Sequence, residues 1–157
     1  MRAGGLAVVA LALAASGPAH AADADLASAR AFVVQLYKAY HGAGPDYLGR
    51  QRDAVFSPRI IALLKRDAQL TPKGDVGALD GDPICDCQDF HISRVEVSLT
   101  PIRSRRTVAD VRFLNFRTPQ AVRLDLIDTG AGWRIDNLHT ASTPDLADYL
   151  QKHAGGR

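Results

Sequence analysis

Glutamate is almost absent from this sequence of 157 residues: Glu96 is the one glutamate, and every other acidic residue is an aspartate. Aspartate favours turns, helix caps and strand ends over helix interiors. An excess of one charge sign is also missing, since 19 Lys and Arg residues stand against 17 Asp and Glu residues, a formal net charge of +2. A balance this close to neutral creates no general electrostatic field for nucleic acid or anionic lipid. We therefore expect no nucleic-acid partner.

Catalytic motifs are missing as well. The sequence contains no HExxH, no GxSxG, no glycine-rich phosphate loop and no paired glutamates. Beyond residue 21 the histidines lie far apart in the sequence and are His41, His91, His139 and His153. A lone histidine at the end of a helix or strand is usually a surface residue. A site assembled from distant residues stays open, but no residue is assigned a catalytic role, and no cofactor or metal is expected.

No apolar run in the sequence is long enough to span a bilayer. The longest comprises residues 6–16, follows the basic Arg2 and precedes Ala19-His20-Ala21. A short apolar run with a basic start and a small-x-small triplet at its end is typical of a cleaved signal peptide. We expect a signal peptide at residues 1–21 and a periplasmic or secreted domain at residues 22–157, with no membrane insertion after cleavage. That length suits one domain with one core.

Two helices are predicted in the first half of the mature chain. Apolar residues recur at three- and four-residue steps from Asp25 to Gly42, as on one face of a helix that Asp25 caps. Ser57 and Pro58 form a second helix start, because serine can cap free N–H groups and proline at the first position sacrifices no hydrogen bond. This second helix is expected to run to about Leu70.

Beyond residue 92 the apolar period changes from 3.6 to 2, which indicates β-strands. The alternation centres on four segments: residues 95–99, 109–113, 122–126 and 133–135. Turns are expected near residues 103–105, 118–120 and 129–132. Short linkers favour an antiparallel meander, and Ser142-Thr143-Pro144 is expected to cap a last helix. Two N-terminal helices, a four-stranded curved antiparallel sheet and a C-terminal helix make an α+β fold of the nuclear-transport-factor-like or cystatin-like kind.

Charged residues alternate with the apolar ones and are expected on the solvated face of this sheet. They are Arg94, Glu96, Asp110, Arg112, Arg123, Asp125, Arg134 and Asp136. Opposite charges on adjacent strands can pair there, each pair contributing roughly 0.2–1 kcal/mol. Trp133 is expected on the other, inward side, next to Ile135.

The most specific stretch is Gly74–Asp89, GDVGALDGDPICDCQD, which we call the acidic segment because it contains no basic residue. It holds both cysteines and five aspartates, Asp75, Asp80, Asp82, Asp86 and Asp89. Two cysteines in an oxidising compartment tend not to stay as thiols, so a Cys85–Cys87 disulfide is favoured. Redox activity is the weaker interpretation, because the usual catalytic spacing has two intervening residues. Zinc would need further ligands from dispersed histidines or nearby aspartates.

The aspartates of the acidic segment leave three interpretations open. Asp80 and Asp82 have a D-x-D spacing suited to calcium, but Pro83 and the cysteines replace the rest of a calcium loop and no bidentate glutamate closes it. Aspartates beside glycine and proline more often bond to their own backbone and hold turns. A constrained loop of five aspartates also suits docking into a cationic cleft with little ordering cost.

A pocket at one end of the sheet is the other candidate binding site. Asn115 and Asn137 continue the inward parity of their strands, and the second and fourth strands of a meander run in the same direction. Both asparagines are therefore expected at the same end of the sheet, near Tyr37 or Tyr40 of the first helix. Polar groups at the end of an apolar concavity are typical of small-ligand sites. They are also typical of a core that meets solvent at strand ends.

Four segments in order carry a family resemblance. FVVQLYKAY, FSPRIIALLKRD, the acidic segment and GWRIDNL together resemble a family of bacterial exported proteins of unknown function, with LDGDP…QD and GWRIDN as the most specific parts. This resemblance implies a periplasmic location and a nuclear-transport-factor-like fold, and it brings no established catalytic residues. More loosely, the size, export signal and lack of enzyme motifs resemble small periplasmic immunity proteins that neutralise cell-wall amidases.

The sequence therefore predicts an exported, non-catalytic binding module that contacts another protein through the acidic segment, in the manner of an immunity protein. A small-ligand-binding protein that uses the pocket between the sheet and the first helix is the alternative. An enzyme with a dispersed site in that cavity is the third possibility.

Overall fold

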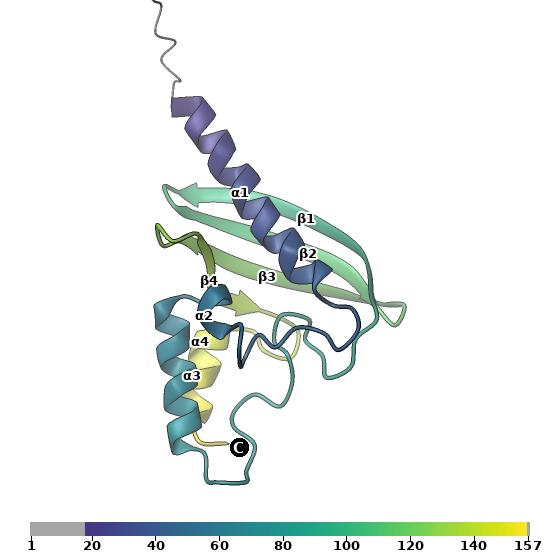
Figure 1. The fold of residues 1–157 in the computed structure, drawn as a ribbon, viewed down its shortest axis with the longest axis vertical. Helices are drawn as coiled ribbons and strands as arrows, with labels where there is room; N and C mark the ends of the chain where they lie inside the picture. Colours follow the sequence, from purple (N-terminus) through teal and green to yellow (C-terminus); the bar gives the residue numbers. More distant parts are fainter. Residues whose placement is uncertain (1–17, 157) are drawn as a thin grey trace, which may run out of the picture.

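The computed structural model describes residues 18–156. In chain order its elements are α1 (Pro18–Lys38), α2 (Arg52–Val55), α3 (Pro58–Leu70), β1 (Ile92–Arg103), β2 (Arg106–Asn115), β3 (Thr118–Asp128), β4 (Trp133–His139) and α4 (Leu146–His153). Helix α1 lies across one face of the curved sheet, whereas α3 and α4 lie side by side near β4 (Figure 1). The predicted α+β fold with a four-stranded antiparallel sheet is confirmed.

Most of the predicted signal peptide, residues 1–17, lies outside the described residues. Its remaining residues, 18–21, belong to the first turn of α1, so cleavage after Ala21 would shorten this helix at its start. Within residues 18–156, no helix combines the length and the apolar character needed to cross a membrane.

Helix α1 occupies an earlier stretch than the predicted Asp25–Gly42. Asp25 lies inside the helix and does not cap it, and its carbonyl oxygen accepts a hydrogen bond from the Ser28 hydroxyl at 2.8 Å. The helix ends at Lys38, and Gly42 follows with a positive φ of 57°. The predicted apolar face is buried where it meets the sheet: Ala29, Val33, Leu36, Tyr37 and, just beyond the helix, Tyr40.

The second predicted helix is confirmed as α3, and a short helix before it was not predicted. The Ser57 hydroxyl accepts from the Ile60 amide at 3.4 Å, and Pro58 occupies the first turn. Helix α2 has four residues, about one turn, and is therefore too short for a helical period of apolar residues to be visible in the sequence. The C-terminal helix is capped later than expected, since Asp145 accepts from the Asp148 amide at 2.9 Å.

The sheet runs β1-β2-β3-β4, and its regularity is greatest between β2 and β3. Their register is uninterrupted from Arg106 opposite Ile127 to Asn115 opposite Thr118. The turn predicted at residues 118–120 is wrong, because these residues already belong to β3. The turn is Phe116–Arg117, with φ values of 48° and 76°. Positive φ at both central residues is what a two-residue hairpin of type I′ requires.

Trp133 lies on the inward face, as the alternation predicted. It is 7% exposed, and its indole Nε1 donates to the Ser28 hydroxyl of α1 at 2.8 Å. The rest of the sheet's contribution to the core alternates in the same way along β2, β3 and β4: Ala109, Val111, Phe113, Val122, Leu124, Leu126 and Ile135.

Two irregularities reverse the predicted orientation of side chains. In β1 the register shifts between Ser93 and Glu96, Arg94 has a φ of 52°, and Val95, which was expected inward, is 37% exposed. In β4 the register shifts beside Asp136, which was expected on the solvated face and is instead only 9% exposed. An extra residue in a strand reverses the faces of its neighbours, so period-two reasoning fails at both places.

Candidate functional site

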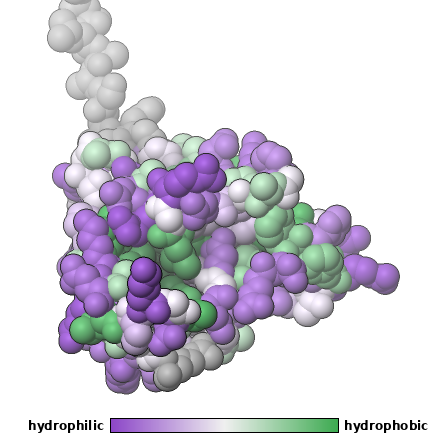
Figure 2. Space-filling view, turned by 60° about the horizontal axis from the view of Figure 1, so that its bottom comes forward, coloured by the Kyte–Doolittle hydropathy of each residue, from purple (hydrophilic) through white to green (hydrophobic). Residues whose placement is uncertain are grey.

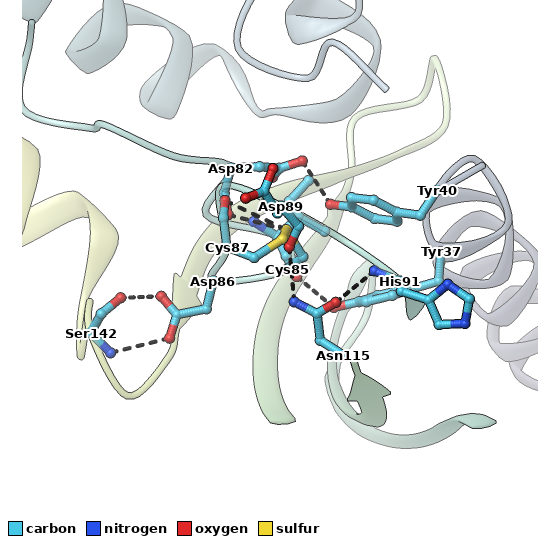
Figure 3. Close-up of a disulfide and its surroundings, with 11 residues drawn as sticks. Tyr37, Tyr40, Asp82, Cys85, Asp86, Cys87, Asp89, His91, Asn115 and Ser142 are labelled. Carbon is cyan, nitrogen blue, oxygen red and sulfur yellow. Dashed lines mark hydrogen bonds between the residues drawn. A yellow bond between two sulfur atoms is a disulfide. The ribbon is translucent and has the colours of Figure 1, made fainter. Parts of the chain in front are cut away.

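The acidic segment connects α3 to β1 and folds back on itself around the two cysteines (Figure 3). The Asp82 amide donates to the Cys87 carbonyl at 2.8 Å, and the Cys87 amide donates to the Asp82 carbonyl at 3.2 Å. Cys85 and Cys87 form a disulfide with their Cα atoms 5.2 Å apart, which confirms the predicted pairing. Gly81 is needed here, because a Cβ at this position would lie 2.8 Å from the Cys87 carbonyl oxygen.

Asp82 points into the protein, toward α1. Its carboxylate accepts from the Tyr40 hydroxyl at 2.7 Å and from the Ile84 amide at 2.8 Å. Burial raises the pKa of Asp82, although the hydrogen bonds from Tyr40 and Ile84 oppose that rise. Burial, together with the Asp82 charge, also raises the pKa of Tyr40. Asp82 therefore fastens the segment to the core and is not displayed to a partner.

Two more side chains, one from α1 and one from β2, bond to the backbone of the acidic segment. The Tyr37 hydroxyl donates to the Ile84 carbonyl at 2.8 Å. The Asn115 amide group donates to the Asp89 carbonyl at 3.0 Å, while its oxygen accepts from the His91 amide at 2.7 Å. Three of the four predicted pocket residues, Tyr37, Tyr40 and Asn115, thus converge on the acidic segment, and protein groups already occupy their polar atoms.

Asn137 lies elsewhere. Asn137 lies opposite Asp125 of β3, and Asp125 lies opposite Val108 of β2. Asn115 is the last residue of β2, so the two asparagines are not at the same end of the sheet. The Asn137 side-chain oxygen accepts from the Ala147 amide at 3.0 Å in the first turn of α4. The extra residue Asp136 turns Asn137 toward α4, away from the three residues gathered under the acidic segment. Ligand binding by these four residues stays a prediction.

Asp86 clasps the acidic segment to the connection between β4 and α4. Its carboxylate accepts from the Ser142 amide at 3.3 Å and from the Ser142 hydroxyl (Figure 3). Asp86 stands between the two cysteines with a φ of 53°, a conformation that aspartate tolerates better than most residues. The disulfide ring is therefore tied to a part of the chain that follows it by more than fifty residues.

The remaining aspartates of the segment, Asp75, Asp80 and Asp89, are exposed. A shallow cavity of about 200 Å³ opens between the disulfide ring and the start of α4, and its walls include Asp80, Asp86 and Tyr149. Hydrophilic and hydrophobic residues are intermixed on the face that comes forward when the lower end of the molecule in Figure 1 is turned toward the viewer (Figure 2). These three aspartates, together with Gly74, Val76 and Gln88, are the residues of the segment that are most open to another molecule.

Asp67 of α3 is a buried anchor that sequence reasoning missed. Both of its carboxylate oxygens lie 3.1 Å from the Ala78 amide nitrogen, and one also accepts from the Gly155 amide at 2.9 Å. A Cβ at position 77 would lie 2.5 Å from the same carboxylate, so Gly77 permits this approach. A signal existed, because Asp67 follows Ile60 by seven residues and so lies on the apolar face of its helix.

Asp136 forms a second missed cluster. Its carboxylate accepts from the Ser57 hydroxyl at 2.7 Å and from Arg106 at 3.0 Å, and Arg59 lies 3.5 Å away. Burial by itself would raise the pKa of Asp136, but the hydrogen bonds and the two guanidinium charges outweigh it and lower that pKa. The cluster joins the start of α3 to β2 and β4, and it lies apart from the acidic segment.

Candidate metal ligands do not cluster among the side chains that the structure describes. Across residues 18–156, no three histidine, cysteine or acidic side chains gather as a metal ion would require. Asp80, Asp82 and Asp86 are separated in role, since Asp82 bonds to Tyr40 and Asp86 bonds to Ser142.

The chain is similar to a bacterial protein of unknown function. It is 33% identical over 112 residues, 68% of its length, to "Uncharacterized protein YqhG" of Escherichia coli (strain K12), and it spans about a third of that relative (36%). No family model matches the chain. No solved structure matches it significantly.

Proposed function

We propose that this protein is an exported, non-catalytic binding module whose acidic segment docks against a basic surface of another protein. The observation that carries the proposal is the way the segment is held. Its backbone and side chains are tied to α1, to β2, to α3 and to the β4–α4 connection, while Asp75, Asp80 and Asp89 stay exposed.

Preorganisation is what makes such a segment suitable for binding. A free loop must lose conformational entropy when it binds, and that cost reduces affinity. The disulfide and the contacts of Tyr40, Tyr37 and Ser142 have already restricted this loop in the unbound protein. Three exposed carboxylates on a rigid support would steer a basic partner and select it by charge.

The roles of the five aspartates then divide in two. Asp82 and Asp86 shape the segment through Tyr40 and Ser142, and their own charges are largely engaged within the protein. Asp75, Asp80 and Asp89 supply the charge that faces outward. We expect the partner to be an exported protein with a cationic cleft. An immunity protein of nuclear-transport-factor-like fold that blocks a cell-wall amidase is the specific form of this proposal.

The test compares capture of partners by two charge-matched variants. Asp75→Asn with Asp80→Asn removes two outward charges from the acidic segment. Asp53→Asn with Asp148→Asn removes two exposed charges elsewhere, with side chains 71% and 53% exposed. Each immobilised protein is exposed to periplasmic extract and culture supernatant over a range of salt concentrations, and thermal melts verify that both variants are folded.

The expected result is that the segment variant loses most of the captured partner and retains a weaker salt dependence, because fewer screened charge contacts remain. The control variant should capture as the wild type does. Equal capture by all three proteins would show that the acidic segment is not part of the binding surface. Equal loss in both variants would show that only the net charge of the protein matters for capture. A captured amidase whose activity falls on binding would support the immunity form.

A further inference from the structure

His139 is the last residue of β4 and stands at the beginning of the connection that leads to α4. Its imidazole is hydrogen-bonded on both sides. Nδ1 lies 2.7 Å from the Pro144 carbonyl oxygen, and Nε2 lies 3.1 Å from a carboxylate oxygen of Asp125 on β3. The ring thus spans from the sheet to the far end of the turn formed by residues 140–144.

Both hydrogen bonds of His139 can form at once only when its ring carries two protons. A carbonyl oxygen and an ionised carboxylate can only accept hydrogen bonds, so each ring nitrogen must donate. Only the imidazolium form of histidine has two N–H groups. A neutral ring keeps one of these bonds and turns a lone pair toward the other acceptor.

Charged groups from every neighbouring element surround this ring. Asp125 and Arg123 face it from β3, and Asp145 lies at the cap of α4. The groove beside His139 is also lined by Asp110 and Arg112 of β2, and Asp110 is paired with Arg123 at 2.9 Å. Burial alone would lower the pKa of His139, but the bonds to Asp125 and Pro144 and the charges of Asp125 and Asp145 raise it above its ordinary value.

The turn of residues 140–144, to which the His139 ring bonds, is also the turn that contacts the acidic segment. Within it the Thr143 amide donates to the Thr140 hydroxyl at 2.9 Å, and the Thr140 amide donates to the Thr143 carbonyl at 2.9 Å. Between them Ser142 presents its amide and hydroxyl to Asp86, the residue between the two cysteines. A ring bond at Pro144 therefore fixes the far side of the same turn.

We propose that His139 is a pH-sensitive clasp: its protonated ring fixes the turn of residues 140–144 against β3 and thereby fixes the Ser142–Asp86 contact to the disulfide ring. A histidine whose pKa is raised in the folded protein contributes stability that is fully present below its unfolded pKa of about 6.5. That contribution is lost as the pH rises through the folded pKa. The acidic segment is thus held more firmly in mildly acidic surroundings. The clasp acts whatever the identity of a bound partner.

The test follows the turn by amide hydrogen exchange in NMR spectra, with rates corrected for the intrinsic effect of pH. The probes are the amides of Ser142 and Thr143, measured from mildly acidic to mildly basic pH. In the wild type, protection of both amides should fall severalfold along the titration curve of the His139 ring. In His139→Gln protection should be low and independent of pH, whereas His41→Gln, which changes an exposed histidine whose ring bonds to the Lys38 carbonyl at the end of α1, should behave as the wild type does.

Asp125→Asn gives an independent measurement that keeps the imidazole. Removing the carboxylate should lower the pKa of His139 and shift the fall in protection to lower pH by the same amount. Protection that stays constant with pH in the wild type would overturn the proposal. So would a fall in His139→Gln equal to that of the wild type, or a midpoint that Asp125→Asn leaves unchanged.

Discussion

The β2–β3 hairpin and the acidic segment are fixed by different means. The hairpin has ten successive residue pairs between its strands without a register shift. The acidic segment has a single bridge between Asp82 and Cys87, and distant side chains such as Asp67, Tyr37 and Asn115 supply its other attachments. In the hairpin, backbone hydrogen bonds of the same kind repeat along both strands. In the acidic segment, each attachment is a different contact that occurs once.

The two regions should respond differently to mutation. Removing an outward side chain from a ladder leaves all of its backbone bonds in place. Removing an anchor leaves a buried amide or carbonyl without a partner, which costs about 1–3 kcal/mol for each group. The hairpin should therefore tolerate most changes of its outward residues, and the acidic segment should be sensitive to single changes.

The largest effect is expected at Trp133, whose core position supports both regions. Trp133→Ala should lower the free energy of unfolding by roughly 3–5 kcal/mol, because it removes a large buried ring and leaves a cavity between β4 and α1. A urea melt measures the loss. The hairpin and the acidic segment should unfold together, since α1 packs on the sheet, carries Tyr37 and leads directly to Tyr40.

Trp133→Phe serves as the control for that change. It keeps most of the apolar area and loses the hydrogen bond to Ser28, so its cost should be clearly smaller. A loss near zero in Trp133→Ala would mean that the ring is not part of the core in solution.

A smaller and more local effect is expected at Asp67. Asp67→Ala leaves the amides of Ala78 and Gly155 without their acceptor and should cost about 1–3 kcal/mol. Hydrogen exchange should accelerate at these two amides and through the acidic segment, while the β2–β3 amides keep the protection set by global unfolding.

Asp53→Ala is the matched control, because its side chain is 71% exposed and it lies in α2, the short helix before α3. It should change neither stability nor exchange to a comparable degree. Uniform acceleration in both regions after Asp67→Ala would show that the segment opens only when the whole domain unfolds, with no local opening of its own, contrary to the comparison.

The same difference explains what could be predicted from the sequence. The strands were recognisable because each alternates locally, and α3 because Ser57 and Pro58 mark its start. The hairpin turn was not, since Phe116 and Arg117 lack the glycine or asparagine that usually signals positive φ. The orientation of Asp136 was also missed, because a bulge depends on the pairing of two strands and not on one strand's own pattern.

For the candidate site, the sequence identified the segment and its disulfide but not the division among its aspartates. Asp82 lies between Gly81 and Pro83, and Asp86 lies between the two cysteines, and neither setting marks its aspartate as bonded within the protein. What separates them from Asp80 is contact with Tyr40 and Ser142, which lie about forty residues before and about fifty-six residues after. Such pairings are set by the tertiary fold, which no local pattern contains.

The smallest effect is expected on the outward face of the hairpin, at the cross-strand pair of Asp110 and Arg123. Their atoms lie 2.9 Å apart, and the side chains are 42% and 58% exposed. Arg123→Ala should lower the free energy of unfolding by only about 0.2–1 kcal/mol, since solvent screens the pair and the ladder beneath it is intact. A double-mutant cycle with Asp110→Ala isolates the coupling, which should shrink further in high salt. A coupling free energy larger than the cost of Asp67→Ala would contradict the comparison. One exposed contact on the hairpin would then contribute more stability than a buried anchor of the acidic segment.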